Sequence, residues 1–521
     1  MFVRRKKNRS GSTSVVVVSK AHGQFHEVKT LGVSSDAAEI ARLHQVGQVW
    51  IREHADMKDL FERARNIEFE RDAVKYFLDN VENILLNGTQ LILDRVFRLT
   101  GFDKIDDDIL KSLVTARICQ PLSKTATIEY LKSHFDEDIE EHRLYKYLDR
   151  LEETQKERVQ QISVEHTRKV IGGKIGVVFY DVTTLYFETD TSDDLRKTGY
   201  SKDGKHSLPQ IVLGLLVSEG GYPLAYSIHE GNKYEGHTML PVITDFVKKF
   251  KLREQDLVVV ADSGLMNNDN LEALDKGKYK YIIGARIKNE SAAITKWILS
   301  CEKKNGSFYE CKKTGKRRLI VGFAEGRAKK DAENRNKGVR RLEKEYGSGT
   351  VTKDKINRRG YNKFLELTED VTVKINYDKI NEDAQWDGWK GYITNTKLEA
   401  KVVCEEYGGL WQVERAFRIS KGRLDLRPMF HFNEKRIRAH VCICFVAYKV
   451  YKELERILKQ KHIGISVDKV LSIAKTITTI CLRLPQSGTT LKRTMLLTER
   501  HKSIAPLFDE NFWLDKSVRI E

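Results

Sequence analysis

The chain has 521 residues, and its 91 Lys and Arg against 74 Asp and Glu give a net charge of +17, which favours a polyanionic partner, either nucleic acid or an anionic membrane surface. Its length predicts two or three domains. No apolar run reaches the roughly 18 to 20 residues of a membrane span, and none forms a signal-peptide core. A cytoplasmic protein without membrane association is therefore expected. Seven cysteines, an odd number with no CxxC pair, exclude a disulfide framework and a zinc knuckle, and Cys442 and Cys444 lie in an apolar run that predicts core packing.

The first third of the chain changes from a strand-like to a helical pattern. Two β-branched stretches within residues 12–31 predict a β-hairpin, which places the first segment at 1–34. From 35 to 172 the apolar spacing is helical, with a break at Pro121. This mostly helical region is either a DNA-binding module or a scaffold that covers the next domain, because it has no clear recognition-helix pattern.

Strand and helix patterns then alternate through residues 173–286. The stretch KIGVVFYDVTTLYFE predicts a central strand that ends in Asp181, and DLVVVAD predicts another that ends in Asp262. Three strands joined by tight turns, followed by a helix, a strand, a helix and a strand, predict a mixed α/β sheet with helices on both faces. The two aspartates are therefore expected to end different strands of one sheet.

A basic segment, 287–386, interrupts this alternation. Between Glu302 and Lys363 there are 20 Lys and Arg against 8 Asp and Glu, a net charge of +12. The pattern predicts a hairpin, a charged helix and further strands, and the excess of positive charge predicts an inserted subdomain that faces DNA phosphates. The alternative is a solvated charged face, which is usual for a run of mixed charge.

Residues 387–460 are expected to return to the sheet and then turn helical. The stretch YGGLWQVERAFRISK places Tyr407, Glu414 and Lys421 seven residues apart, which stacks them along one face of a continuous helix. A second, apolar helix follows, and 461–521 form a C-terminal region without assigned chemistry. A glutamate on such a helix is most often solvated, so the stripe alone does not establish a site.

Three motifs together resemble the acidic motifs of DDE transposases of the IS4 superfamily, the IS1634-like group in particular. These motifs are YDVTTLYFE around Asp181, VVVADSGL around Asp262, and Y-x6-E-x6-K at Tyr407, Glu414 and Lys421, accompanied by GYSKDGK, HEGN and RPMFHFNEKRIRAHV. The resemblance implies an RNase H-like mixed-sheet catalytic core, interrupted by a mainly β insertion. One departure is Leu410, which stands where the superfamily has an arginine, so that arginine's phosphate contact is not carried over.

Three carboxylates suit DNA cleavage, because two Mg²⁺ ions about 4 Å apart can activate a nucleophile and stabilise the leaving oxygen. The resemblance implies Asp181, Asp262 and Glu414 as the catalytic and metal-binding residues, with Asp181 bridging both ions. Mn²⁺ is expected to substitute for Mg²⁺.

DNA contacts are expected beside these acids. Lys421 and Arg418 share the face of Glu414 and are predicted to contact phosphate. Tyr407 either stacks near the scissile phosphate or packs, and Trp297 in the insertion either stacks on a flipped base or packs in a core.

The expected function is that of a bacterial insertion-sequence transposase. It would bind the terminal inverted repeats in double-stranded DNA, cut at their ends and join the freed 3′-hydroxyls to target DNA. Because two ends must be paired, a homodimer is expected in the DNA complex. The alternatives are an RNase H-like nuclease without joining activity and a catalytically inactive DNA-binding protein.

Overall fold

The computed structural model describes residues 1–21, 24–105, 107–201, 204–265, 267–347, 360–367, 373–427 and 429–508, without the side chains of residues 21, 55–65, 255 and 347. Lys202 and Asp203 of GYSKDGK, residues 370–372 of an expected strand, Pro428 and the last 13 residues of the C-terminal region lie outside these ranges. The chain divides into two compact units, one of residues 1–84 with 479–494 and the other of residues 85–478 with 495–520.

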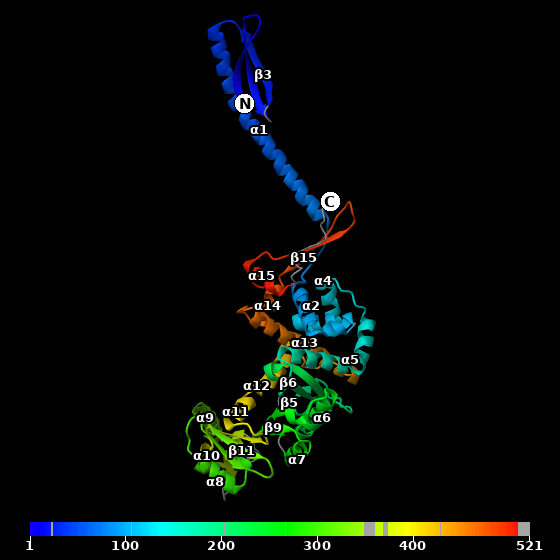
Figure 1. The fold of residues 1–521 in the computed structure, drawn as a ribbon, viewed down its shortest axis with the longest axis vertical. Coiled ribbons are helices and arrows are strands. Elements are labelled where there is room, and N and C mark those ends of the chain that lie inside the picture. The colour runs from blue at the N-terminus through cyan, green and yellow to red at the C-terminus, as the bar shows by residue number, and fades with distance from the viewer. Residues whose placement is uncertain are drawn as a thin grey trace. The chain divides into compact units, whose positions relative to one another are not determined.

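The first unit combines two small sheets with a long helix (Figure 1). β2 (Thr13–Ala21) and β3 (Gln24–Ser34) pair where the hairpin is predicted, and β1 (Phe2–Lys7) pairs with β2 as a third strand. α1 (Ala37–Asp79) packs against all three strands and covers the buried valines 15–18. The second sheet has the order β16 (Thr490–Met495), β15 (Thr478–Arg483), β4 (Val81–Leu85).

The second unit begins with a group of helices around the long helix α13 (Glu434–Gln460). The first, second and fourth of them pack on α13, and the third packs on the second. These helices are α2 (Gly88–Thr100), α3 (Asp108–Cys119), α4 (Lys124–Phe135) and α5 (Glu141–Val170). The interruption between α3 and α4 falls at the predicted break, and Cys442 and Cys444 are buried in α13 as predicted. Among the described residues, no helix combines the length and the apolar character needed to cross a membrane.

An eight-stranded mixed sheet forms the middle of this unit. Its order is β10 (Phe308–Lys312), β11 (Arg318–Phe323), β14 (Trp389–Thr394), β9 (Lys280–Ala285), β8 (Val258–Ala261), β5 (Val177–Tyr186), β6 (Gln210–Ser218), β7 (Pro223–Glu230). β5, β6 and β7 pair antiparallel, whereas β8 runs parallel to both β5 and β9. The predicted mixed sheet is therefore present, with β5 in its interior.

Helices cover both faces of the sheet (Figure 1). One face packs against α6 (Met239–Lys249), α7 (Asn268–Lys276) and α8 (Ala292–Ser300) in one hydrophobic cluster. The other face belongs to a larger cluster that includes α5, α13, α11 (Ala400–Gly408) and α12 (Trp411–Arg418). Short helices α14 (Val467–Ala474) and α15 (Glu499–Ser503) complete the unit.

The basic segment 287–386 differs from the mainly β insertion that was expected. Its predicted hairpin, β10 and β11, extends the main sheet through antiparallel pairing of β11 with β14. Most of its other described residues are helical, in α8, α9 (Glu325–Gly347) and α10 (Tyr377–Ala384), beside the short strands β12 (Leu365–Leu367) and β13 (Val373–Ile375). The expectation of a mainly β subdomain was wrong because α9 is long and rich in Lys, Arg, Glu and Ala, which are good helix formers.

Candidate active site

Asp181 and Asp262 come from adjacent parallel strands at the same level of the sheet. Tyr180 and Ala261, the residues that immediately precede them, are register partners in β5 and β8. Neighbouring strands lie about 4.8 Å apart, so this register brings the two aspartates close together. Asp181 and Asp262 therefore follow register partners in adjacent strands of one sheet.

Both aspartates belong to the face covered by α11, α12 and α13. Side chains alternate between the two faces along a strand, so Asp181 lies on the same sheet face as Phe179, and Asp262 on the same face as Val260. Phe179 and Val260 both belong to the larger hydrophobic cluster. Asp181 is half-buried within β5 rather than at its end, because β5 continues to pair with β6 as far as Tyr186. The prediction that a strand ends at its aspartate holds for β8, which ends at Ala261, immediately before Asp262.

Glu414 lies on α12, which packs against β5 and β6 and leaves this side chain exposed. A Cβ atom at Gly409, just before α12, would lie only 2.5 Å from Phe179 Cζ. Only glycine therefore lets the backbone approach β5 this closely. On the outer side of α12, Arg415 forms a bidentate ion pair with Glu455 of α13. These contacts fix the helix that carries Glu414 over the face of Asp181.

Tyr407 connects α11 to the second aspartate. Its hydroxyl donates a hydrogen bond to Asp262 Oδ1 at 2.7 Å, and its ring packs against that of Tyr392 with centroids 4.9 Å apart. The hydroxyl reaches Asp262 over Gly284 of β9, where a Cβ would lie 2.6 Å from the hydroxyl oxygen. Burial raises the pKa of Tyr407, as do the negative charges of Asp262 and Glu414, so the phenol remains a donor.

Lys390 is a cation of this site that the sequence reasoning did not identify. It lies on β14, half-buried, with its Nζ 4.2 Å from the centroid of the Tyr407 ring. Burial lowers the pKa of Lys390 and so does the positive charge of Arg327, whereas Asp262 and Glu414 raise it. The available signal was a single lysine in the otherwise apolar strand WKGYIT.

A fourth carboxylate, Glu235, also lies near Asp262 and was not predicted. A Cβ at Gly264 would be 3.7 Å from Glu235 Oε2 and 4.0 Å from Asp262 Oδ2. The buried amide of Asn270 donates hydrogen bonds to the carbonyls of Gly236 at 2.5 Å and Leu265 at 2.9 Å. Asn270 thereby holds the turn that carries Glu235 against the turn that follows Asp262.

The predicted stripe of Tyr407, Glu414 and Lys421 is not one continuous helix face. Tyr407 is at the buried end of α11, Glu414 is exposed on α12, and Lys421 is half-buried in a π-helical turn, Ile419–Arg423. The two glycines after Tyr407 end α11, and the π-helical turn changes the register after α12. Arg418 is exposed in the last turn of α12, one helical turn after Glu414.

Trp297 lies apart from these elements in the chain, on α8 of the basic segment. Its side chain is half-buried against the hydrophobic cluster beneath α6 and α7. This environment matches the packing alternative for Trp297.

The donor chemistry of the three acids fits Mg²⁺, which prefers carboxylate oxygens. In the described part of the chain, however, no three His, Cys, Asp or Glu side chains are gathered closely enough to hold one metal ion. Asp181 and Asp262 share a sheet face, and Glu414 lies on α12, which packs against that face.

Comparisons with known proteins show the family to which the chain belongs. A family model described as "Transposase DDE domain" matches residues 172–449, more than half of the chain. A search of curated proteins found no match. Among solved structures, the chain is similar to a piggyBac transposase in a synaptic complex with hairpin DNA, with 9% identity and a TM-score of 0.37 over 70% of this chain and 68% of that chain.

Proposed function

Because the chain belongs to the transposase DDE domain family, we propose that it is a DNA transposase of the IS4 superfamily, in the IS1634-like group. In this proposal it binds the terminal inverted repeats of its element, cleaves DNA at their ends and transfers the 3′ ends to target DNA. The observation that carries the proposal is the register of β5 and β8, in which the partners Tyr180 and Ala261 precede Asp181 and Asp262.

The proposed catalytic core is RNase H-like. Its support is the strand order β7-β6-β5-β8-β9, in which three antiparallel strands are followed by two parallel ones. The proposed catalytic residues are Asp181 and Asp262 on this sheet and Glu414 on the helix above it.

In the proposed mechanism, Asp181, Asp262 and Glu414 would hold Mg²⁺, for which Mn²⁺ could substitute. Bound there, the ions would supply a nucleophile activated at neutral pH and a positive charge at the leaving oxygen. Tyr407 orients Asp262 by donating to Oδ1, while Arg418 and Lys421 extend the positive surface along the DNA backbone beyond Glu414. Trp297 remains a proposed DNA contact only if its half-buried ring becomes accessible in the complex.

The proposed partners are the two transposon ends and a target duplex, with the protein acting as a homodimer in the DNA complex. The proposed location is the bacterial cytoplasm, in association with DNA. The net charge of +17 supports a partner that is a polyanion.

The test uses the purified chain, Mg²⁺, a donor plasmid that carries its coding region with the native flanking DNA, and a second, supercoiled target plasmid. We expect breaks at the boundaries of the element and products in which the element's ends are joined to the target. Breaks without joined products would favour the nuclease, and DNA binding without breaks would favour the inactive DNA-binding protein. Either outcome contradicts the proposed transposase.

A further inference from the structure

Lys390 occupies a position from which its charge faces the proposed cleavage site. On β14, Lys390 and Tyr392 alternate onto the same face of the sheet, and the Tyr392 ring packs against Tyr407. The Nζ of Lys390 lies 4.2 Å from the centroid of the Tyr407 ring and 5.8 Å from that of Tyr392. Since the Tyr407 hydroxyl bonds to Asp262, the ammonium and that carboxylate contact the same tyrosine.

The aromatic rings hold this ammonium without neutralising it. Within the described ranges, Lys390 forms no ion pair, whereas other half-buried lysines, such as Lys313 with Glu290, are paired at 2.6 Å. The face of an aromatic ring attracts a cation but, unlike a carboxylate, carries no net negative charge that would neutralise it. The three N–H donors of Lys390 therefore remain suited to an anion that enters beside Asp262.

No cation reaches the site from position 410. Leu410 is only 5% exposed and is part of the larger hydrophobic cluster, so this position contributes packing alone. Lys390 comes from a different element, β14, yet it reaches the ring of Tyr407 that contacts Asp262. It is thus a cation placed on the sheet side of the site, whereas Arg418 and Lys421 lie on the helical side.

We propose that Lys390 is a catalytic residue that contacts the scissile phosphate and stabilises the negative charge that develops on it during cleavage. This inference rests on the proposed function. A compact ammonium beside a phosphoryl oxygen stabilises the transition state more than the ground state, because charge accumulates there as the new bond forms. Arg327, on the first turn of the charged helix α9, is exposed and close enough to Lys390 for its positive charge to lower the pKa of Lys390.

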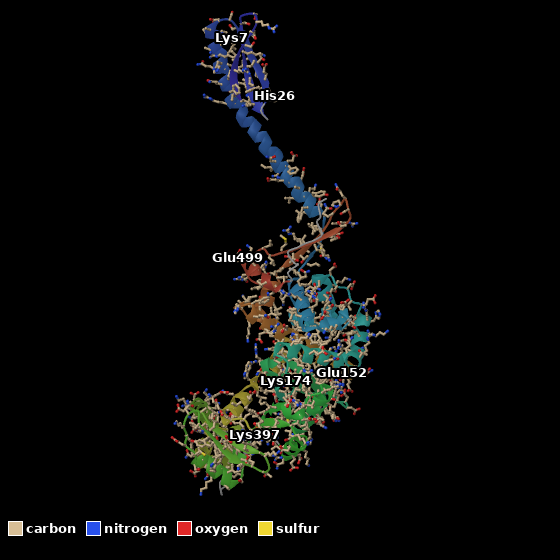
Figure 2. All side chains as sticks on the ribbon, in the orientation of Figure 1. Lys7, His26, Glu152, Lys174, Lys397 and Glu499 are labelled. Carbon is tan, nitrogen blue, oxygen red and sulfur yellow. The ribbon has the colours of Figure 1, made fainter. Side chains whose placement is uncertain are left out.

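The test compares Lys390→Gln and Lys390→Arg with Lys397→Gln in cleavage of the donor plasmid at saturating Mg²⁺. Lys397, labelled in Figure 2, is an exposed lysine between β14 and α11 and serves as the control. We expect Lys390→Gln to slow cleavage by about 100-fold. Lys390→Arg should retain activity within about tenfold of the wild type, because it keeps the charge. The Lys397 variant should cleave normally.

A second measurement, the salt dependence of DNA affinity, is made without metal. In EDTA, we expect Lys390→Gln to reduce the slope of log affinity against log salt by about 1 for a duplex of the native flanking DNA, as the loss of one phosphate contact requires. Melting temperatures within about 2 °C of the wild type would show that all three variants fold.

The competing explanation is that Lys390 only offsets the charges of Asp262 and Glu414. Under that explanation, Lys390→Gln would lower the Mg²⁺ concentration needed for cleavage, leaving the rate at saturation and the salt slope unchanged. That result would overturn the assignment while the transposase proposal stands. If the wild type itself cleaves no donor plasmid, the proposed function fails and the assignment falls with it.

Discussion

Tyr407 is the residue through which the acids, the cation and the hydrophobic core of the site are connected. Its ring packs against Tyr392 and supports Lys390, while its hydroxyl donates to Asp262. A phenol that remains protonated fixes one carboxylate oxygen without adding charge to the site. These contacts favour a positioning role for Tyr407, and stacking near the scissile phosphate stays a prediction from the sequence.

Replacing Tyr407 by Phe tests this role, because the ring and its contacts remain and only the hydroxyl is lost. We expect cleavage to fall about tenfold, which corresponds to the roughly 1.5 kcal/mol of a hydrogen bond to a charged group. Tyr392→Phe is the matched control, since its hydroxyl contacts Cys404 rather than an acid of the site. Equal effects of the two substitutions on donor-plasmid cleavage would contradict the positioning role.

Glu453 shows how a buried charge on α13 depends on its partners. Burial alone would raise its pKa, but hydrogen bonds from Arg456 and His166 outweigh burial and lower the pKa of Glu453 from 4.5 to about 2. A pKa that is lower in the folded state stabilises the protein above the unfolded value, and this contribution is lost as the pH falls from about 4.5 towards 2.

We expect Glu453→Gln to reduce the free energy of unfolding at pH 7 by about 3 kcal/mol, because it leaves Arg456 without its buried partner. The difference from the wild type should shrink below pH 4.5. Melting curves between pH 7 and 3 measure this effect, with Glu434→Gln, an exposed substitution on the same helix, as the control. A difference that does not depend on pH would contradict the assigned ion pair.

Among the structural elements, α12 depends on an unusually close approach to β5. A Cβ at Gly409 would clash with Phe179, whereas Gly408, its neighbour, has no atom within 4 Å of the corresponding position. Position 409 therefore requires glycine and position 408 does not, although the sequence GG does not distinguish them.

We expect Gly409→Ala to lower the free energy of unfolding by about 2 kcal/mol through overpacking and to reduce cleavage by displacing Glu414. Gly408→Ala, at the end of α11, should be neutral or stabilise the protein by up to about 1 kcal/mol, because alanine favours the helix. Urea unfolding and donor-plasmid cleavage measure both variants. A Gly409 variant as stable and active as the wild type would show that α12 does not need this contact.

Local sequence patterns predicted most of the elements but not how some of them pair. The strands around Asp181 and Asp262 were predicted because apolar, β-branched runs are local signals. β1 was not predicted, because the charged stretch FVRRKK resembles no half-buried strand. Pairing of β11 with β14 joins residues about seventy positions apart, and no local pattern records such a contact. The same limit kept Lys390 from being recognised, since its neighbours Tyr407 and Asp262 come from other elements.

For the molecule as a whole, the excess of positive charge determines how strongly DNA binding should depend on salt. Exposed cations of α9 include Lys329, Lys330 and Lys337, in the segment whose net charge is +12. If the chain neutralises 6 to 10 phosphates, its affinity for duplex DNA should fall by roughly 10³ to 10⁵ between about 50 and 200 mM salt.

Replacing these three lysines by glutamine should lower the salt slope by about 1 for each phosphate contact that is lost. Glu333→Gln, an exposed substitution on the same helix, removes a negative charge and should strengthen binding slightly. Fluorescence anisotropy at several salt concentrations measures both. An unchanged slope in the triple variant would show that α9 is a solvated charged face, the alternative considered from the sequence.

Whether Asp181, Asp262 and Glu414 form one catalytic site is tested by donor-plasmid cleavage in Mg²⁺ by Asp181→Asn, with DNA binding measured in parallel. We expect cleavage to fall by about a thousandfold or more while the affinity for the flanking DNA is retained, because the carboxylate acts in chemistry rather than in binding. Cleavage by Asp181→Asn at the wild-type rate would contradict the assigned site.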